Sequence, residues 1–396
     1  MDVETDSSIV PLPEAFLVFL NQNGLDSSIY ASSDSIPRYV RLKPGNEANV
    51  EAIEVDIGCK LEKVFWLPNF YCLAPDVRIA SSKAYQNGMI YGIDAASGAA
   101  VLALDISAGD HVLDLCAAPG AKLCMILDSL GNSGSVSGVD IAKHRLAACR
   151  SMLLKYGLGD RCRLFVADGT TFSLLPVKAI PVSESQNQLE VYKEWKSRRP
   201  WKERRREALA RENGYSKFSS PTQEPELLFY GKKSGVVGLT RNTLYQRVHC
   251  GNVYEFGYDK VLVDAECTHD GSIKHIQKFE QWGWTTLQRR VLDAERTDDL
   301  PILQLKLLTN GFKLLKVGGF LVYSTCSLTD AQNEDVVDKF LSENSSAELV
   351  EIDGARNWPC KDGRIPKTIR FDPLISGTSG LFIAKFTKVA LWCGIH

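Results

Sequence analysis

The sequence lacks several features that would place it in common protein classes. Its 396 residues include 11 cysteines, an odd number, with no Cys-x-x-Cys pair and no zinc-ligand spacing. This argues against a disulfide framework and gives no metal site. There is no run of about 20 apolar residues, and we see no N-terminal apolar segment preceded by basic residues. We therefore expect no membrane partner and an intracellular location, in the nucleus or the cytoplasm.

The chain also lacks an excess of charge of one sign. Its formal net charge is -2 at pH 7, so a polyanion would have to bind at a local patch. The strongest such patch is a basic run at residues 193–211, in which Trp195 and Trp201 lie among lysines and arginines. Such a run can bind RNA phosphates and stack on bases, but it can equally be a nuclear-import signal or a solvated helix.

A tight turn of small residues between two short apolar strands is the centre of the pattern. The first strand ends at Asp114, a helix is predicted over 123–130, and the second strand ends at Asp140. This is the βαβ unit of a doubly wound sheet, in which the ligand binds beyond the carboxyl ends of the strands. A carboxylate at Asp140 can accept both hydroxyls of a ribose, which favours a nucleoside-containing cofactor.

The same turn has only Gly120 where a dinucleotide fingerprint has three glycines. An NAD-dependent oxidoreductase is therefore disfavoured, although a purely structural turn stays open on this stretch alone. A third strand at 163–166 leads to Asp168, which could accept a hydrogen bond from an adenine amino group. Acids at strand ends also cap helices, and that is their commoner role.

The composition divides the chain into parts. Residues 1–35 are acidic and serine-rich, with one short helix predicted at 13–21. Residues 36–80 are expected to form a small α+β module, either an accessory layer or an RNA-binding unit. Residues 81–390 form the main domain, with a basic insertion at about 176–257. Within the small module, short alternating segments lie at 39–42, 50–57, 64–67 and 71–73.

Two cysteines follow predicted strands of the main domain. The fourth strand ends at Asp264, three residues before Cys267, and the fifth strand, at 320–323, leads to Cys326. Both cysteines should lie at the cofactor edge of the sheet. A lone cysteine is usually an inert core residue, but a pair beside an acid at this edge indicates chemistry.

Methylation at C5 of cytosine would use such a pair. A thiolate that adds to C6 makes C5 nucleophilic, and an acid or hydrogen bond at N3 stabilises the charge that develops. Removal of the C5 proton then allows the thiolate to leave, which calls for a base or a second group near the adduct.

Four motifs carry a resemblance to a known family. They are Asp-Leu-Cys-Ala-Ala-Pro-Gly-Ala-Lys at 114–122, Asp-Ala-Glu-Cys at 264–267, the segment 314–327 ending in Ser-Thr-Cys-Ser, and Asn-Glu-Asp-Val-Val at 333–337. Together, from about residue 37 to 386 without the insertion, they resemble the Sun/RsmB-type RNA (cytosine-5) methyltransferases. The resemblance implies an α/β class I S-adenosylmethionine-dependent methyltransferase, a Rossmann-like doubly wound sheet, preceded by a small RNA-recognition-like module.

The resemblance also implies roles for individual residues. Cys326 matches the nucleophile, Cys267 the cysteine that assists release of methylated RNA, and Asp264 the acid that contacts the cytosine. The positions that match S-adenosylmethionine-binding residues are Cys116, Ala117, Ala118, Pro119, Gly120, Ala121, Lys122, Asp140, Arg145, Asp168 and Asp264. The implied partner is RNA, with tRNA favoured and rRNA next, and we expect a monomer.

The sequence departs from the family pattern at several positions. Glu266 replaces the usual proline and should raise the pKa of Cys267 by its charge, slowing product release. Asp94 stands where glutamine is common, Ala121 replaces a glycine, and residues 378–382 differ from the usual Asp-Gly-Phe-Phe. A methyltransferase-fold RNA-binding scaffold with weak or no activity is therefore the alternative function.

Overall fold

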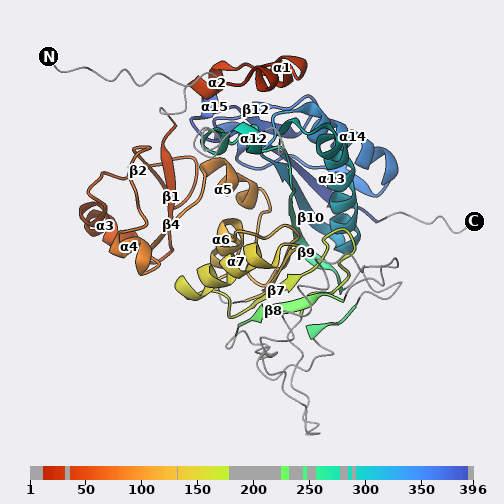
Figure 1. The fold of residues 1–396 in the computed structure, drawn as a ribbon. Coiled ribbons are helices and arrows are strands. Elements are labelled where there is room, and N and C mark those ends of the chain that lie inside the picture. The colour runs from red at the N-terminus through yellow and green to blue at the C-terminus, as the bar shows by residue number, and fades with distance from the viewer. Residues whose placement is uncertain are drawn as a thin grey trace, which may run out of the picture.

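A computed structural model describes residues 12–31, 36–131, 133–177, 224–231, 244–247, 256–276, 284–287 and 291–390. These residues form a small sheet and a large sheet, which lie side by side in Figure 1 with helices α5 and α6 near their boundary. The basic run at 193–211, including Trp195 and Trp201, lies outside the described residues. Within the described part, none of the helices combines the length and apolar character needed to span a bilayer.

The small sheet is antiparallel, with strand order β2-β3-β1-β4. Its strands are β1 (Arg38–Leu42), β2 (Glu62–Lys63), β3 (Phe70–Leu73) and β4 (Ile90–Gly92), accompanied by helices α3 (Val50–Ile57) and α4 (Lys83–Gln86). Because β4 pairs with β1 through Val40 and Gly92, the sheet includes residues beyond position 80, where we expected the module to end.

Two segments of the small module differ from the alternating pattern we expected. Residues 50–57 form a helix, because Ile53 is buried while Val55 is 84% exposed, and the left-handed Gly58 ends the helix. Residues 64–67 follow β2 and form turns instead of a strand. Their apolar side chains Val64 and Leu67 pack into the core of the main domain.

The large sheet has the strand order β12-β13-β14-β10-β9-β5-β6-β7-β8, with β11 paired to β14. Its central five strands are parallel, and β14 and β8 pair antiparallel at either side. The doubly wound α/β sheet predicted from the sequence is therefore confirmed. The strands are β5 (His111–Asp114), β6 (Ser135–Asp140), β7 (Cys162–Val166), β8 (Glu226–Tyr230), β9 (Tyr258–Asp264), β10 (Leu315–Thr325), β11 (Ala347–Leu349), β12 (Lys361–Asp362), β13 (Thr368–Phe371) and β14 (Leu381–Lys388).

Helices cover both faces of this sheet and create two apolar cores. One core contains buried residues of α5 (Ala95–Leu102), α6 (Ala121–Leu130) and α7 (Lys143–Lys155). The other contains residues of α13 (Ala294–Leu314) and α14 (Glu334–Glu343). Strands that are buried on both faces have nearly continuous apolar sequences, and this is why the strands could be predicted from the sequence.

Strand β8 corrects our view of the insertion. Residues 226–230 pair antiparallel with β7 and form the edge of the large sheet, so the segment at 176–257 is not wholly an excursion from the domain. We missed this strand because the basic composition around it dominated the pattern.

The first two helices, α1 (Glu14–Gln22) and α2 (Ser28–Ala31), lie at the top of Figure 1. Phe16, Leu20 and Tyr30 share a separate apolar cluster with Ile273 and Ile276. The remaining short elements are α12 (Trp284–Leu287), α15 (Pro373–Ser376) and the 3-10 turns Glu47–Asn49, Asp330–Gln332 and Ala355–Asn357.

Candidate active site

Of the residues predicted to bind the cofactor, the loop 116–122 and Asp140 meet at the carboxyl ends of β5 and β6. The loop after β5 runs through Cys116 to Gly120, and α6 begins at Ala121. Gly120 has a φ of 112°, and a Cβ there would lie 3.0 Å from the Cα of Cys149 in α7. Glycine is required at this position because the loop is packed closely against the helix.

Asp140, at the end of β6, is buried and holds this loop. Its Oδ2 accepts a hydrogen bond from the Ala118 N–H at 3.2 Å, and its Oδ1 accepts one from the Ala142 N–H at 2.8 Å. Arg145 donates to the carbonyl oxygen of Ala118 at 3.0 Å. Arg145 therefore stabilises the conformation of the loop through its hydrogen bond to the Ala118 carbonyl. Asp168 is exposed and accepts bonds from the backbone and hydroxyl of Thr170, at 2.8 and 2.7 Å.

The charge at this edge fits S-adenosylmethionine, whose sulfonium is a cation. Burial, followed by the charges of the neighbouring Asp264 and Asp140, raises the pKa of Asp114 to about 7. The pKa of Cys116 is also raised, by burial and then by surrounding carboxylates. The carboxyl groups of Asp114, Asp140 and Asp264 lie close enough to act on one another and on Cys116, and such a group of acids suits a cation and disfavours the pyrophosphate of a dinucleotide.

Asp264, at the end of β9, is bonded on both oxygens. Lys122 Nζ donates to its Oδ2 at 2.8 Å and Ser324 Oγ to its Oδ1 at 2.8 Å. Lys122 also donates to Ser97 at 3.0 Å. Burial lowers the pKa of Lys122, but the attraction of Asp264 outweighs this and leaves the pKa raised. Lys122 and Asp264 therefore form a partly buried ion pair between the predicted cofactor loop and the cysteines.

The two predicted cysteines lie against each other, with their Sγ atoms 3.3 Å apart. Cys267 is fully buried, whereas Cys326 is partly accessible. Both follow adjacent parallel strands, β9 and β10, whose register pairs Asp264 with Ser324. The prediction that these residues meet at one edge of the sheet agrees with the structure.

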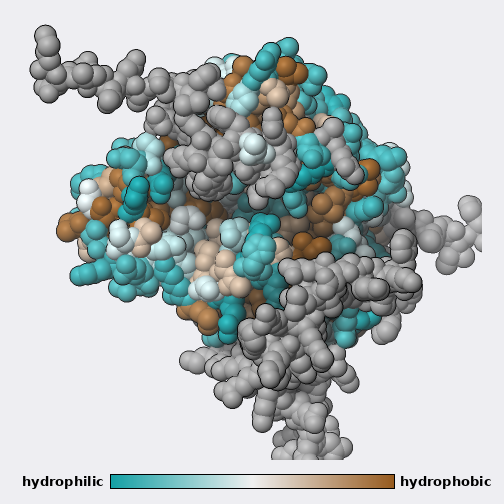
Figure 2. All heavy atoms as spheres, viewed as in Figure 1, coloured by the Kyte–Doolittle hydropathy of each residue, from teal (hydrophilic) through white to brown (hydrophobic). Residues whose placement is uncertain are grey.

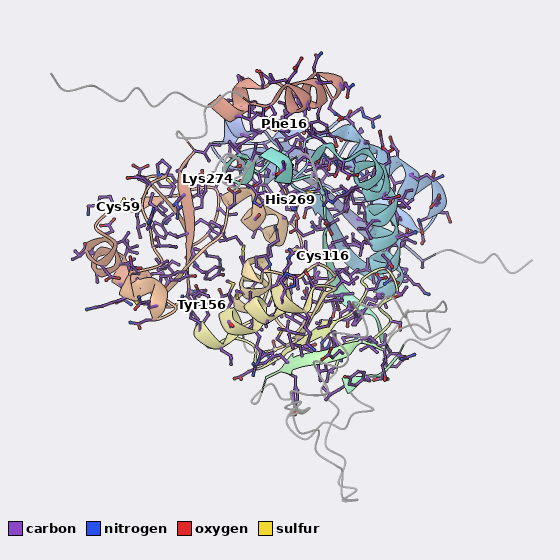
Figure 3. All side chains as sticks on the ribbon, in the orientation of Figure 1. Phe16, Cys59, Cys116, Tyr156, His269 and Lys274 are labelled. Carbon is purple, nitrogen blue, oxygen red and sulfur yellow. The ribbon has the colours of Figure 1, made fainter. Side chains whose placement is uncertain are left out.

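A histidine that we did not single out from the sequence completes the cluster. His269 Nδ1 lies 2.9 Å from Cys326 Sγ and 3.6 Å from Cys267 Sγ. Figure 3 labels His269 near the middle of the molecule, between Lys274 and Cys116. The only sequence signal was its place two residues after Cys267, because a lone histidine carries no motif.

The three side chains share charge. Burial raises the pKa of Cys267, but the hydrogen bond from Cys326 and the charge of His269 outweigh burial and bring the pKa well below that of an ordinary thiol. The negative Cys267 raises the pKa of His269. The bond to Cys267, and then burial, raise the pKa of Cys326. These shifts favour a charged pair of Cys267 and His269 beside a protonated Cys326.

These three donors lie within 4.8 Å of one another, as in a metal site. Two thiolates on a tetrahedral zinc ion would be about 3.8 Å apart, given a Zn–S distance of about 2.3 Å. The observed 3.3 Å between the sulfurs is shorter, which is the geometry of a hydrogen bond between two sulfur atoms.

Backbone bonds fasten the loops that carry the cysteines. The Gly271 N–H donates to the Cys326 carbonyl at 2.9 Å, and the Gly380 N–H donates to the Gly271 carbonyl at 2.8 Å. Asn333, from the last of the four motifs, donates to the Ser327 carbonyl at 2.8 Å and accepts from Thr325 at 2.6 Å. The motif at 333–337 thus positions the Cys326 loop, a role we had not assigned.

The pKa of Cys267 is lowered by Cys326 and His269, and the effect of the Glu266 charge on that thiol stays a prediction. Glu266 is exposed, and Arg296 Nη2 donates to its Oε1 at 2.8 Å. The positive charge of Arg296 offsets the charge of Glu266, which weakens the effect of Glu266 on the buried Cys267 sulfur.

Two other departures from the family pattern contact each other. Asp94 caps α5 by accepting from the Ala96 N–H at 3.0 Å, and its other oxygen accepts from the Ser379 N–H at 3.1 Å. The changed residue at 94 therefore supports the changed loop at 378–382.

Comparison with known proteins shows which family the chain is similar to. A family model described as 16S rRNA methyltransferase RsmB/F matches residues 101–180 and 241–387, more than half of the chain. The tRNA (cytosine(49)-C(5))-methyltransferase of Pyrococcus abyssi (strain GE5 / Orsay) is 24% identical over 355 residues, which cover 87% of this chain and 85% of the relative. The mitochondrial tRNA (cytosine(34)-C(5))-methyltransferase of Mus musculus is 36% identical over 104 residues, which cover 26% of this chain and 28% of the mouse protein.

A solved structure agrees with the fold. NSun6 from Pyrococcus horikoshii, crystallised with the S-adenosylmethionine analogue SFG, has a TM-score of 0.63 at 16% identity, over 96% of this chain and 99% of that one. The similarity extends over both sheets described above.

Proposed function

This chain belongs to the 16S rRNA methyltransferase RsmB/F family, and from that premise we propose that it methylates C5 of a cytosine in RNA through a covalent bond between Cys326 and ring C6. The observation that carries the proposal is the pair of thiols, 3.3 Å apart, at the ends of two adjacent strands beside Asp264. Cys326 is assigned as the nucleophile because it is the partly accessible member, while Cys267 lies fully buried behind it.

The reaction needs a group that meets the charge on the cytosine. When Cys326 adds to C6, electron density moves into the ring toward N3. The Asp264–Lys122 pair, with a heavy-atom distance of 2.8 Å, lies next to the cysteines and can present a proton to the base. Ser324 fixes the Asp264 carboxylate in place. Asp264 is therefore the residue that orients the cytosine.

S-adenosylmethionine, when bound, supplies the methyl group. The residues that would hold it are the loop 116–122, Asp140 and Asp168. Arg145 supports the loop through the Ala118 carbonyl. Cys267 remains beside Cys326 after the adduct forms and is placed to assist its release.

A route for RNA follows from two cavities between the small sheet and the main domain. Arg38 lines both of them. One cavity also contains Lys274 and Tyr39; the other contains Arg78 and Tyr85 and reaches Pro119 of the cofactor loop. Cations beside aromatic rings are suited to phosphates and unstacked bases. Figure 2 shows hydrophilic and hydrophobic residues mixed across this face.

We assign tRNA as the first candidate substrate and rRNA as the second. The archaeal and mouse relatives are named for tRNA, and the family model is named for 16S rRNA. The mouse relative is named as mitochondrial. The test of location must therefore include mitochondria beside the nucleus and cytoplasm that the sequence favoured.

The function is tested by transfer of labelled methyl from S-adenosylmethionine to size-fractionated total RNA. Wild type should label one fraction as 5-methylcytosine, and Cys326→Ala should not. Cys360→Ala is the matched control, because Cys360 is a partly buried cysteine whose thiol donates to the Ala355 carbonyl. Cys267→Ala should form the adduct more slowly than wild type but, once it has formed, should retain RNA as a covalent complex that survives denaturing electrophoresis.

Two outcomes would contradict the proposal. Equal labelling by wild type and Cys326→Ala would overturn the assignment of the nucleophile. Binding of S-adenosylmethionine and RNA with no labelling of any fraction, including RNA from cells that lack this protein, would favour the scaffold function.

A further inference from the structure

His269 is placed on the reacting sulfurs by an uncommon backbone conformation. Its φ is 60°, in the left-handed region that residues other than glycine seldom adopt. Such conformations cluster at active sites, where the surrounding structure holds them in place. Here it directs Nδ1 to within 2.9 Å of Cys326 Sγ.

The buried thiolate needs a cation, and His269 supplies it. Burial alone disfavours a charged sulfur. Lys122 is the other nearby cation among the described residues of the site, and its Nζ is bonded to Asp264 at 2.8 Å. The imidazole of His269 contacts both sulfurs directly, at 2.9 and 3.6 Å.

We propose that His269 is a catalytic residue, whose imidazolium is the fixed counter-charge of a cysteine pair that shares one proton, so that Cys326 can attack by passing that proton to Cys267. This inference rests on the proposed function, which names Cys326 as the nucleophile. Cysteine nucleophiles are generally activated by a neighbouring cation or base within hydrogen-bond reach.

The step balances in protons and electrons. A lone pair of Cys326 Sγ forms the bond to C6, and the C5–C6 π electrons move into the ring. The Cys326 S–H bond breaks, and its proton passes over the 3.3 Å gap to the Cys267 thiolate. His269 stays protonated and donates a hydrogen bond to Cys326 throughout. Cys267 is thus left as a thiol beside the adduct.

The surroundings of His269 favour its charged form. The negative groups act on it from the end of β9 and the loop that follows, and the ring of His275 lies 5.6 Å from its own. The titratable groups that face it are Cys267, Glu266, Asp264, Cys326 and His275.

The test begins with the protein alone, without RNA. In wild type, the rate of alkylation of the cysteine pair by iodoacetamide, followed by peptide mass spectrometry, should show a thiolate at neutral pH. His269→Asn tolerates the left-handed backbone but has no charge. It should shift the alkylation profile of the pair upward by at least one pH unit, equivalent to a tenfold loss of thiolate at a given pH below the transition. His269→Gly, which relieves the backbone, should shift it equally.

The second readout is the rate of a single turnover on RNA. His269→Asn should be slowed at least tenfold at pH 7 and should recover toward wild type as the pH rises. His275→Gln is the matched control, because it removes a neighbouring imidazole without touching a sulfur, and should keep the wild-type profile.

The outcomes separate this inference from the proposed function. Unchanged alkylation in both His269 variants, with turnover within twofold of wild type, overturns the inference. A wild type that makes no 5-methylcytosine overturns the proposed function, yet the alkylation shift would still establish the charge pairing. Slow turnover at every pH with an unshifted alkylation profile would assign His269 a merely structural role, against the inference.

Discussion

The N–H of Gly271 donates a hydrogen bond to the carbonyl oxygen of Cys326 at 2.9 Å. This bond joins the loop that carries Cys267 to the loop that carries Cys326, and Gly380 extends the connection to a third loop. The distance between the sulfurs therefore depends on main-chain contacts as much as on the side chains themselves.

We predict that Gly271→Ala abolishes most of the activity. A Cβ at this position would lie 2.6 Å from the Cys326 carbonyl oxygen and 3.1 Å from the Cα of Gly380. Displacement by about 1 Å can lower a rate on the order of 100-fold, which single-turnover methylation would measure. Gly92→Ala is the control, because the nearest atom to its Cβ would be 3.8 Å away. Both variants are assayed at saturating RNA, because Gly92 lines the two cavities proposed for RNA. Equal rates for the two variants would show that the main-chain contacts of Gly271 do not set the position of Cys326.

Replacing Arg296, the ion-pair partner of Glu266, should shift the alkylation of the cysteines more than replacing Glu266 itself. Glu266→Gln should leave methylation within about threefold and stability within about 1 kcal/mol, because the ion pair is partly exposed. Arg296→Gln leaves an unpaired negative charge near the cysteines and should shift their alkylation to higher pH. The idea fails if Glu266→Gln produces the larger shift.

Lys122→Met should slow methylation on the order of 100-fold, since it removes the proton donor paired with Asp264 at 2.8 Å. Lys60→Met is the matched control: it breaks an ion pair with Glu54 at 2.6 Å, but on an exposed surface. Single-turnover rates with saturating RNA would compare the two. A Lys122→Met enzyme as fast as Lys60→Met would exclude the ion pair from the reaction.

Asp114 should make the protein less stable as the pH rises. Its pKa is raised from 3.8 to about 7 by burial and by Asp264. Between these values the native state binds more protons than the unfolded state, so the free energy of unfolding falls with increasing pH. Above about pH 7, where Asp114 is ionised in both states, the free energy of unfolding no longer falls for this reason.

Asp114→Asn removes this dependence while it keeps an oxygen for the Cys116 N–H. Relative to wild type, the variant should gain about 3 kcal/mol in the free energy of unfolding between pH 5 and pH 8. Denaturant unfolding without cofactor at the two pH values would measure the gain. Parallel pH profiles for the two proteins would show that Asp114 is not the source.

The sequence allowed the large sheet and most of the site to be predicted because both depend on local patterns. Strands buried on both faces are continuous apolar runs, and parallel strands bring their carboxyl ends together, so Asp264, Cys267 and Cys326 had to meet. The helix at 50–57 was missed because its apolar residues fit a period of 2 nearly as well as 3.6. Tertiary burial of Ile53 decided between them.

Other features depend on contacts between distant segments. The position of His269 follows from one left-handed residue, which no composition or spacing reveals. The pairing of Glu266 with Arg296 joins residues 30 positions apart on different elements. Strand β8 becomes recognisable only when it is seen beside β7.

The contact between Tyr30 and Asp270 has a consequence for how the chain is made. The Tyr30 hydroxyl donates to the Asp270 carbonyl at 2.8 Å, across 240 residues of sequence. At about 5 to 20 residues per second, roughly 10 to 50 s separate the synthesis of α2 from that of its partner. During that interval Phe16, Leu20 and Tyr30 lack the apolar surface that later covers them. Helices α1 and α2 are thus natural targets for chaperones until the loop beside His269 leaves the ribosome.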